Sequence, residues 1–131
     1  MYTVKQVAEL SGVSVRTLHH YDAIGLLRPA HVGANGYRYY DEAALLRLQQ
    51  ILFYRELGLE LAQIKDLLDD PSFDVTAALR GHRETLAARI DRMLNLIDTI
   101  DTTIAGLTGE GDDTMGKKLF KGFSEEKQKD Y

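Results

Sequence analysis

Residues 14–21 concentrate side chains that can bind nucleic acid within a single short predicted helix. A guanidinium can read guanine through two hydrogen bonds or hold a phosphate, and Ser and Thr hydroxyl groups hold phosphates. Imidazole and phenol groups add further hydrogen-bond donors. The residues of this set are Ser14, Arg16, Thr17, His20 and Tyr21. Val15 and Leu18 are expected to face the core, and a polar helix surface exposed to solvent is the simpler alternative.

The elements that position this helix form a helix-turn-helix outline. Thr3 and Gln6 have the spacing of a capping box and predict a first helix that begins at Val4. Gly12 breaks that helix, and Ser14 is a favourable N-cap for a second helix over residues 15–23. Two short helices joined by a Gly-containing turn are typical of this motif, although many helical proteins contain one.

A β-hairpin is predicted directly after these helices. Asn35-Gly36 favours a type I′ turn with positive φ at both residues. Arg38 and Tyr39 follow the turn, where a cation can meet phosphate and a phenol can donate a hydrogen bond. One of Tyr37 and Tyr39 is expected to pack on the next helix. A protruding basic and aromatic hairpin beside a polar helix favours a DNA-binding wing.

Two further helices are predicted before Pro71. Asp41 is the expected N-cap of a third helix that ends near Gly58, and a short fourth helix ends before Asp70-Pro71. Their expected inner faces are Leu45, Leu48, Ile51 and Leu52 in the third helix, and Leu61, Ile64, Leu67 and Leu68 in the fourth.

A heptad pattern runs through residues 74–107. Ile90, Ile97 and Ile104 recur every seven residues, and a second series follows three residues later at Leu79, Leu86, Met93, Ile100 and Leu107. Such a helix is roughly 50 Å long at about 1.5 Å per residue. A small domain cannot cover so long an apolar seam, so we expect a partner helix. Packing of the helix on its own domain is the alternative.

Charge and composition exclude several kinds of protein. The net charge is −4, but residues 1–40 carry four basic and two acidic side chains, which permits a local contact with a polyanion. The absence of Cys excludes disulfides and thiolate metal sites. His19 and His20 diverge by about 100° on a helix and cannot easily share a metal ion. We therefore expect no bound metal or cofactor, and no arrangement of catalytic residues indicates an enzyme.

The sequence shows no sign of a membrane segment or an export signal. No apolar run approaches the roughly 18 residues of a membrane span, and the start of the chain lacks the pattern of a signal peptide. These features predict a cytoplasmic protein. Residues 108–131 contain a Gly- and Asp-rich linker and then Leu119, Phe120 and Phe123. This final stretch predicts the start of a further domain, cut short at Tyr131.

Several segments, in order, resemble the DNA-binding domain of MerR-family transcription regulators: residues 2–8, 12–22, 25–29 and 36–40. Residues 48–58 resemble the TipA-type branch of this family, and residues 119–124 resemble the start of its effector domain. Together these likenesses cover about residues 2–107 and extend to the segment at 119.

The resemblance implies a mainly α fold with three parts. Residues 2–72 would form a winged helix-turn-helix DNA-binding domain, 74–107 an antiparallel coiled coil that makes a homodimer, and 108–131 a linker and truncated effector domain. The family binds pseudo-palindromic operators in promoters whose −35 to −10 spacer is too long. It bends and untwists this promoter DNA, and so acts on RNA polymerase indirectly.

By motif position, the resemblance places Arg16, Thr17, His20 and Tyr21 in the recognition helix and Arg38 and Tyr39 in the wing. The sensing activities of the family that rely on Cys are excluded in this chain. The main alternative function is a protein-interaction module in which the heptad helix docks a partner helix.

Overall fold

The computed structural model describes residues 1–109, 116 and 119–123. Contacts divide the chain into unit 1, Met1–Ala78, and unit 2, Leu79–Tyr131. This division falls inside the last helix, because the first turn of that helix belongs to unit 1.

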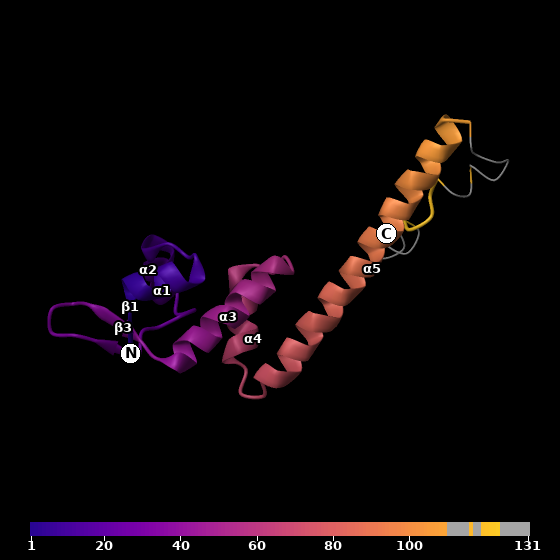
Figure 1. Cartoon of the computed structure of the whole chain (residues 1–131). Helices are drawn as coiled ribbons and strands as arrows, with labels where there is room; N and C mark the ends of the chain where they lie inside the picture. Colours follow the sequence, from indigo (N-terminus) through magenta and orange to yellow (C-terminus); the bar gives the residue numbers. More distant parts are fainter. Residues whose placement is uncertain (110–115, 117–118, 124–131) are drawn as a thin grey trace. The chain divides into compact units, whose positions relative to one another are not determined.

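Unit 1 begins with the predicted pair of short helices, α1 (Val4–Ser11) and α2 (Val15–Ala23) (Figure 1). The capping box is confirmed: Gln6 N donates to Thr3 Oγ1 at 3.2 Å, and Thr3 N donates to Gln6 Oε1 at 2.9 Å. Gly12 ends α1 with a φ of 76°, a left-handed conformation that favours glycine.

A three-stranded antiparallel sheet packs beside these helices. It contains β1 (Tyr2–Thr3), β2 (His31–Val32) and β3 (Arg38–Tyr40) in the order β1-β3-β2. Strands β2 and β3 are the predicted hairpin, which we call the wing hairpin together with its loop at 33–37. Strand β1 was not predicted, because two residues are too few to show an alternating pattern.

The predicted type I′ turn of the wing hairpin is wrong. No residue other than glycine has a positive φ in the described part of the chain, so Asn35 does not adopt the required conformation. Gly36 N instead donates to Gly33 O at 2.9 Å, and Gly36 has a φ of 81°. Asn35 Oδ1 accepts a hydrogen bond from Tyr37 N at 3.1 Å. The loop is therefore a longer turn that ends in a left-handed glycine.

Helices α3 (Glu42–Glu56) and α4 (Leu61–Asp69) follow the sheet. Asp41 is the N-cap of α3 as predicted, because its Oδ1 accepts from Ala44 N at 2.8 Å. The expected inner face of α4 is partly wrong: Ile64 and Leu68 are buried, whereas Leu67 is 41% exposed.

The core of unit 1 collects apolar residues from both helical pairs and the sheet. Its fully buried members are Val7, Leu18, Tyr21, Leu26, Leu27, Tyr40, Leu48, Ile51 and Ile64. Val15 was expected in this core but is exposed, because it lies in the first turn of α2, beyond the packed face. Of the three tyrosines at 37–40, Tyr40 is the buried one and Tyr37 is exposed.

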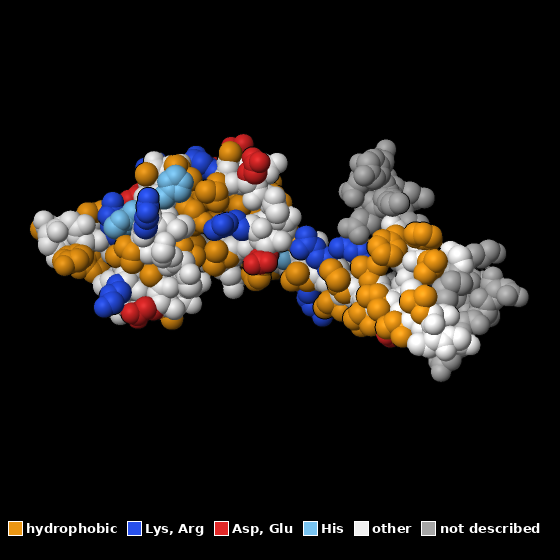
Figure 2. All heavy atoms as spheres, turned by 90° about the horizontal axis from the view of Figure 1, so that it is seen from above, with side chains coloured by type: hydrophobic (Ala, Val, Ile, Leu, Met, Phe, Trp, Pro, Cys, Tyr) orange, Lys and Arg blue, Asp and Glu red, His pale blue; other side chains and the backbone are white. Residues whose placement is uncertain are grey.

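Helix α5 (Val75–Leu107) is continuous and begins at the predicted place, where Asp74 Oδ1 accepts from Ala77 N at 3.2 Å. The apolar heptad positions from Leu86 onward are exposed, whereas Leu79 is half-buried. We call the exposed positions the apolar seam: Leu86, Ile90, Met93, Ile97, Ile100, Ile104 and Leu107. Figure 2 shows apolar side chains gathered along this helix. No described helix is long and apolar enough to cross a membrane.

Residues 119–123 form a turn that lies against α5 within unit 2. Thr99 Oγ1 donates to Lys121 O at 2.6 Å, and Lys121 Nζ lies 3.5 Å from Asp98 Oδ2. Leu119 and Phe123 line an apolar pocket with Ile100 and Ile104 of the seam. The predicted helix from Ser124 onward lies outside the described residues.

Candidate nucleic-acid interface

The surface of α2 presents most of the predicted recognition residues. Ser14, Arg16 and His20 are exposed, and Thr17 is half-buried. Ser14 Oγ accepts from Thr17 N at 3.0 Å and donates to Thr17 Oγ1 at 2.8 Å. This pair fixes the start of the helix that carries Arg16. Figure 2 shows Lys, Arg and His side chains on one face of unit 1.

Tyr21 does not join this exposed set. Its side chain is 1% exposed, and its hydroxyl accepts a hydrogen bond from Arg55 Nη1 at 2.9 Å. The residue links α2 to α3 through the core. This burial argues against the direct DNA contact that we expected of Tyr21, and indicates that the residue holds α2 against α3.

Arg38 connects the wing hairpin to α2. Its Nε lies 3.0 Å from Asp22 Oδ2, and both side chains are about one-third exposed or less. Tyr40 follows on the same face of β3, because side chains two residues apart share a face. Burial raises the pKa of Tyr40, and the charge of Asp22 raises it further, whereas the charge of Arg38 lowers it.

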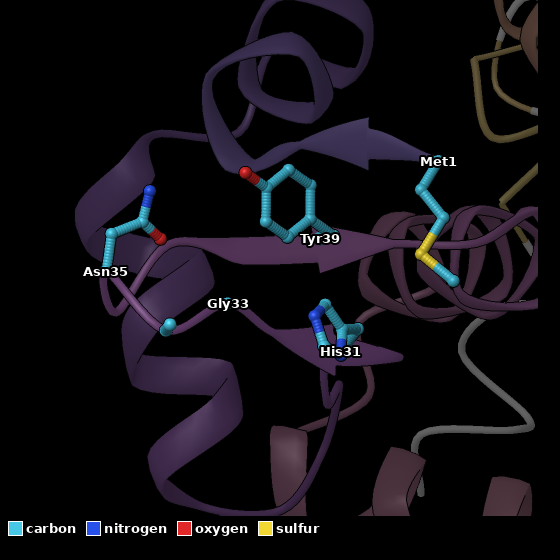
Figure 3. A pocket seen from close by; sticks show the side chains of 6 residues that line it. Met1, His31, Gly33, Asn35 and Tyr39 are labelled. Carbon is cyan, nitrogen blue, oxygen red and sulfur yellow. The ribbon is translucent and has the colours of Figure 1, made fainter.

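The opposite face of the wing hairpin carries Tyr39. Its ring lies 6.0 Å from that of His31, measured between centroids. Together with Met1, Gly33, Ala34 and Asn35, these two residues line an open pocket of about 530 Å³ (Figure 3). A Cβ at Gly33 would lie 2.9 Å from Asn35 Oδ1 and 3.3 Å from the Tyr39 ring, so this position admits only glycine without rearrangement.

Arg47, which the sequence analysis did not single out, links α3 to its surroundings. Its Nε donates to Leu26 O at 2.7 Å, and its Nη1 donates to Leu68 O at 3.3 Å. Its Nη2 forms an ion pair with Asp69 at 2.8 Å, which Lys65 also contacts. The hydrogen bond from Lys65, followed by that from Arg47, lowers the pKa of Asp69. Only the folded chain brings these residues together, so their spacing in the sequence did not predict the contacts of Arg47.

The site offers charge, hydroxyl groups and aromatic rings rather than catalytic chemistry. Within the described residues, no group of three His, Asp or Glu side chains is arranged to hold a metal ion. Exposed Arg16 and the hydroxyl groups near it suit a polyanion, and the wing hairpin places Tyr39 and His31 on an accessible face.

Comparison with known families gives two overlapping matches. The family of MerR HTH regulatory proteins matches residues 2–70, and the family described as MerR, DNA binding, matches residues 45–103. Together they cover both the winged unit and most of α5.

Individual relatives agree with this assignment. The chain is 63% identical over 129 residues to the HTH-type transcriptional regulator SkgA of Caulobacter vibrioides, covering 98% of this chain and 50% of that protein. It is 52% identical over 135 residues to the HTH-type transcriptional activator Mta of Bacillus subtilis, covering 99% of this chain and 52% of that protein. The chain thus spans about half the length of these curated relatives.

Solved structures show the same fold. The crystal structure of SkgA from Caulobacter crescentus matches with a TM-score of 0.86 at 60% identity, over 98% of this chain and 92% of that chain. EcmrR, solved with DNA in a complex named EcmrR-RPo, matches with a TM-score of 0.51 at 28% identity, over 82% of this chain and 40% of that chain. These relatives are transcription regulators rather than enzymes, and the chain belongs to the MerR family of helix-turn-helix regulatory proteins.

Proposed function

We propose that this chain is the DNA-binding and dimerisation part of a transcription activator that recognises a promoter sequence. The observation that carries the proposal is the polar surface of α2, on which Ser14, Arg16 and His20 are exposed, in one unit with the wing hairpin. The Mta relative is named an activator, and EcmrR was solved with DNA.

The recognition helix would read bases, and the wing would hold the backbone. A helix that enters the major groove contacts base edges with its first turns, where Arg16 lies. Ser14 and His20, which are exposed, and Thr17, which is half-buried, would bind phosphates around it. Tyr39 is the proposed wing contact, since it lies on the accessible face of β3 (Figure 3).

Two copies would join through the apolar seam of α5. Ile90, Ile97 and Ile104 are each 53–60% exposed in the single chain, and Leu107 is 81% exposed. A row of aliphatic side chains at heptad spacing matches the a and d positions of a coiled coil. A monomer rarely exposes so long an apolar surface to water, so pairing with a second copy accounts for its exposure.

The family resemblance suggests how such a dimer would activate transcription. Two winged units held by an antiparallel coiled coil would bind a pseudo-palindromic site in an overlong −35 to −10 spacer. Bending and untwisting this spacer would bring both promoter elements into reach of RNA polymerase, without a direct catalytic role for the protein. Shortening the spacer should then make transcription from the promoter independent of the protein.

DNA binding is tested by fluorescence anisotropy with a labelled duplex from the gene's own promoter and a scrambled duplex of equal composition. Titrations at several salt concentrations measure the part of the affinity that comes from phosphate contacts. We expect tighter binding to the promoter, with an affinity that falls steeply as salt rises.

Equal and weak binding to both duplexes would contradict recognition of this promoter. A selection of bound duplexes from a random pool then completes the test. Enrichment of a palindromic sequence would support the proposal at a different operator. No enrichment would sink it and favour a protein-interaction module that docks its partner on α5.

A further inference from the structure

The Asp22–Arg38 ion pair joins the two elements that the proposed function assigns to DNA. Asp22 lies in the last turn of α2, and Arg38 lies in β3, sixteen residues further along the chain. The 3.0 Å contact is a charge-assisted hydrogen bond between Nε and Oδ2. Side-chain exposures of 32% for Arg38 and 26% for Asp22 reduce its screening by water.

The position of Asp22 is unfavourable for a carboxylate in two respects. The C-terminal end of a helix carries partial negative charge, which repels an acidic side chain in the last turn. A carboxylate next to a DNA-binding surface also repels phosphate. The bond to Arg38 offsets both of these unfavourable interactions of the Asp22 carboxylate.

The wing hairpin is also attached to β1 and to the core. It joins β1 through the pairing of Thr3 with Tyr39, and Ala30 N, just before β2, donates to Tyr39 O at 2.9 Å. Tyr40 anchors the base of β3 in the core. Arg38 is two residues nearer the loop, so its bond to Asp22 restrains the hairpin beyond that anchor.

We propose that Asp22 is a positioning residue for DNA recognition, which acts through Arg38 to fix the wing hairpin against the recognition helix. This inference rests on the proposed function and deepens it. The pair sets the distance between the helix in the groove and the wing on the backbone. Asp22 thus contributes to selective binding although its charge repels DNA.

Asp22→Asn separates two roles of the ion pair, because they predict opposite changes in DNA affinity. If Arg38 served only as a phosphate contact, loss of the Asp22 charge would free its guanidinium and tighten binding to every duplex. If Asp22 is a positioning residue, Asp22→Asn weakens binding to the preferred duplex about tenfold. Binding to a scrambled duplex stays the same or tightens, because a negative charge has been removed.

Two further variants complete the DNA-binding experiment on the full chain. Glu9→Gln is the matched control, because Glu9 is an exposed acidic residue on α1 of the same unit. It makes the same change of charge and should not weaken selective binding. Arg38→Gln combined with Asp22→Asn should be no weaker than Arg38→Gln alone, since both changes break the same bond.

Hydrogen exchange of the free protein provides a readout that does not depend on DNA. In Asp22→Asn, the amides of Ala30 and Gly33 should exchange at least about threefold faster, while core amides of α3 keep their rates. Unchanged exchange in the hairpin, or tighter binding to the preferred duplex, would overturn the inference. If the wild-type chain prefers no duplex, the proposed function fails, and the exchange rates still decide whether the pair restrains the hairpin.

Discussion

Unit 1 buries many of its apolar side chains, whereas unit 2 exposes a row of them. In unit 1, Leu18 and Ile51 are completely buried, and the core is closed by residues of the same unit. In unit 2, Ile97 and Ile100 are more than half exposed on the surface of α5. Burial of apolar area stabilises a fold by about 25 cal/mol per Å². Unit 1 gains this stabilisation by itself, whereas most of the seam of α5 remains exposed and can gain it from a second surface.

The largest expected effect follows from a charge placed in the seam. Ile97→Asp should abolish the dimer, because association would bury an unpaired carboxylate between the two helices. Sedimentation equilibrium should show monomers at concentrations where the wild-type chain is dimeric. The loss of association free energy should be about 3 kcal/mol or more, since the change removes an apolar contact and also buries a charge.

Ala88→Asp is the matched control for this experiment. Ala88 is exposed on α5 but lies outside both heptad series. This variant should therefore remain dimeric. A dimer that survives Ile97→Asp would refute the seam as the interface. The exposure of apolar residues in unit 2 would then have no explanation.

A smaller effect is expected on the polar surface of unit 1. Arg16→Ala should weaken binding to the preferred duplex by about 1–3 kcal/mol, because a bidentate contact to guanine would be lost. The affinity for a scrambled duplex should change less. An equal loss on both duplexes would make Arg16 a phosphate contact rather than a reader of sequence.

Lowering the pH should destabilise the fold through a buried residue of α5, which the exposed seam cannot do. His82 is 5% exposed, and burial lowers its pKa below the ordinary value of 6.5. The unfolded chain therefore takes up a proton more readily than the folded chain. The stability that neutral His82 contributes above pH 6.5 should be lost as the pH falls below that value.

Thermal unfolding between pH 7.5 and pH 5 measures this effect. The melting temperature of the wild-type chain should fall by a few degrees. His82→Gln cannot titrate in this range, so it should show a smaller fall. An equal fall in both chains would assign the pH dependence to other groups.

The smallest expected effect concerns a buried hydroxyl in unit 1. Tyr40 is fully buried, and its hydroxyl has no hydrogen-bond partner. Tyr40→Phe removes this unsatisfied group and keeps the ring, so it should raise the free energy of unfolding by about 1 kcal/mol. Tyr37→Phe, at a 62% exposed position, should leave stability unchanged. A loss of stability in Tyr40→Phe would show that the hydroxyl is satisfied in solution.

Features fixed by near neighbours in the chain were predictable from sequence. The caps at Thr3, Ser14 and Asp41 were predicted correctly, because each depends on residues three positions apart. The heptad spacing likewise predicted the long helix, since its period is a property of one segment. The proposed DNA contacts remain predictions, although the structure exposes Arg16 and Ser14.

Features set by tertiary contacts were not predictable. Tyr21 and Arg16 both lie on a nine-residue helix, too short for its pattern to show which side packs on α3. The Asp22–Arg38 pair joins residues from different elements, and a spacing of sixteen residues matches no helix or strand period that would predict a contact. The loop of the wing hairpin contains Asn-Gly, but hydrogen bonds across Gly33 and Gly36 select another turn.

The stoichiometry of the DNA complex tests the account most directly, because it requires both units to act together. Sedimentation velocity of the chain with a labelled, selected duplex gives the mass of the complex. We predict two chains on each duplex for the wild type, and loss of this complex in Ile97→Asp at the same concentration. A single chain on the duplex, bound equally well by Ile97→Asp, would contradict the account.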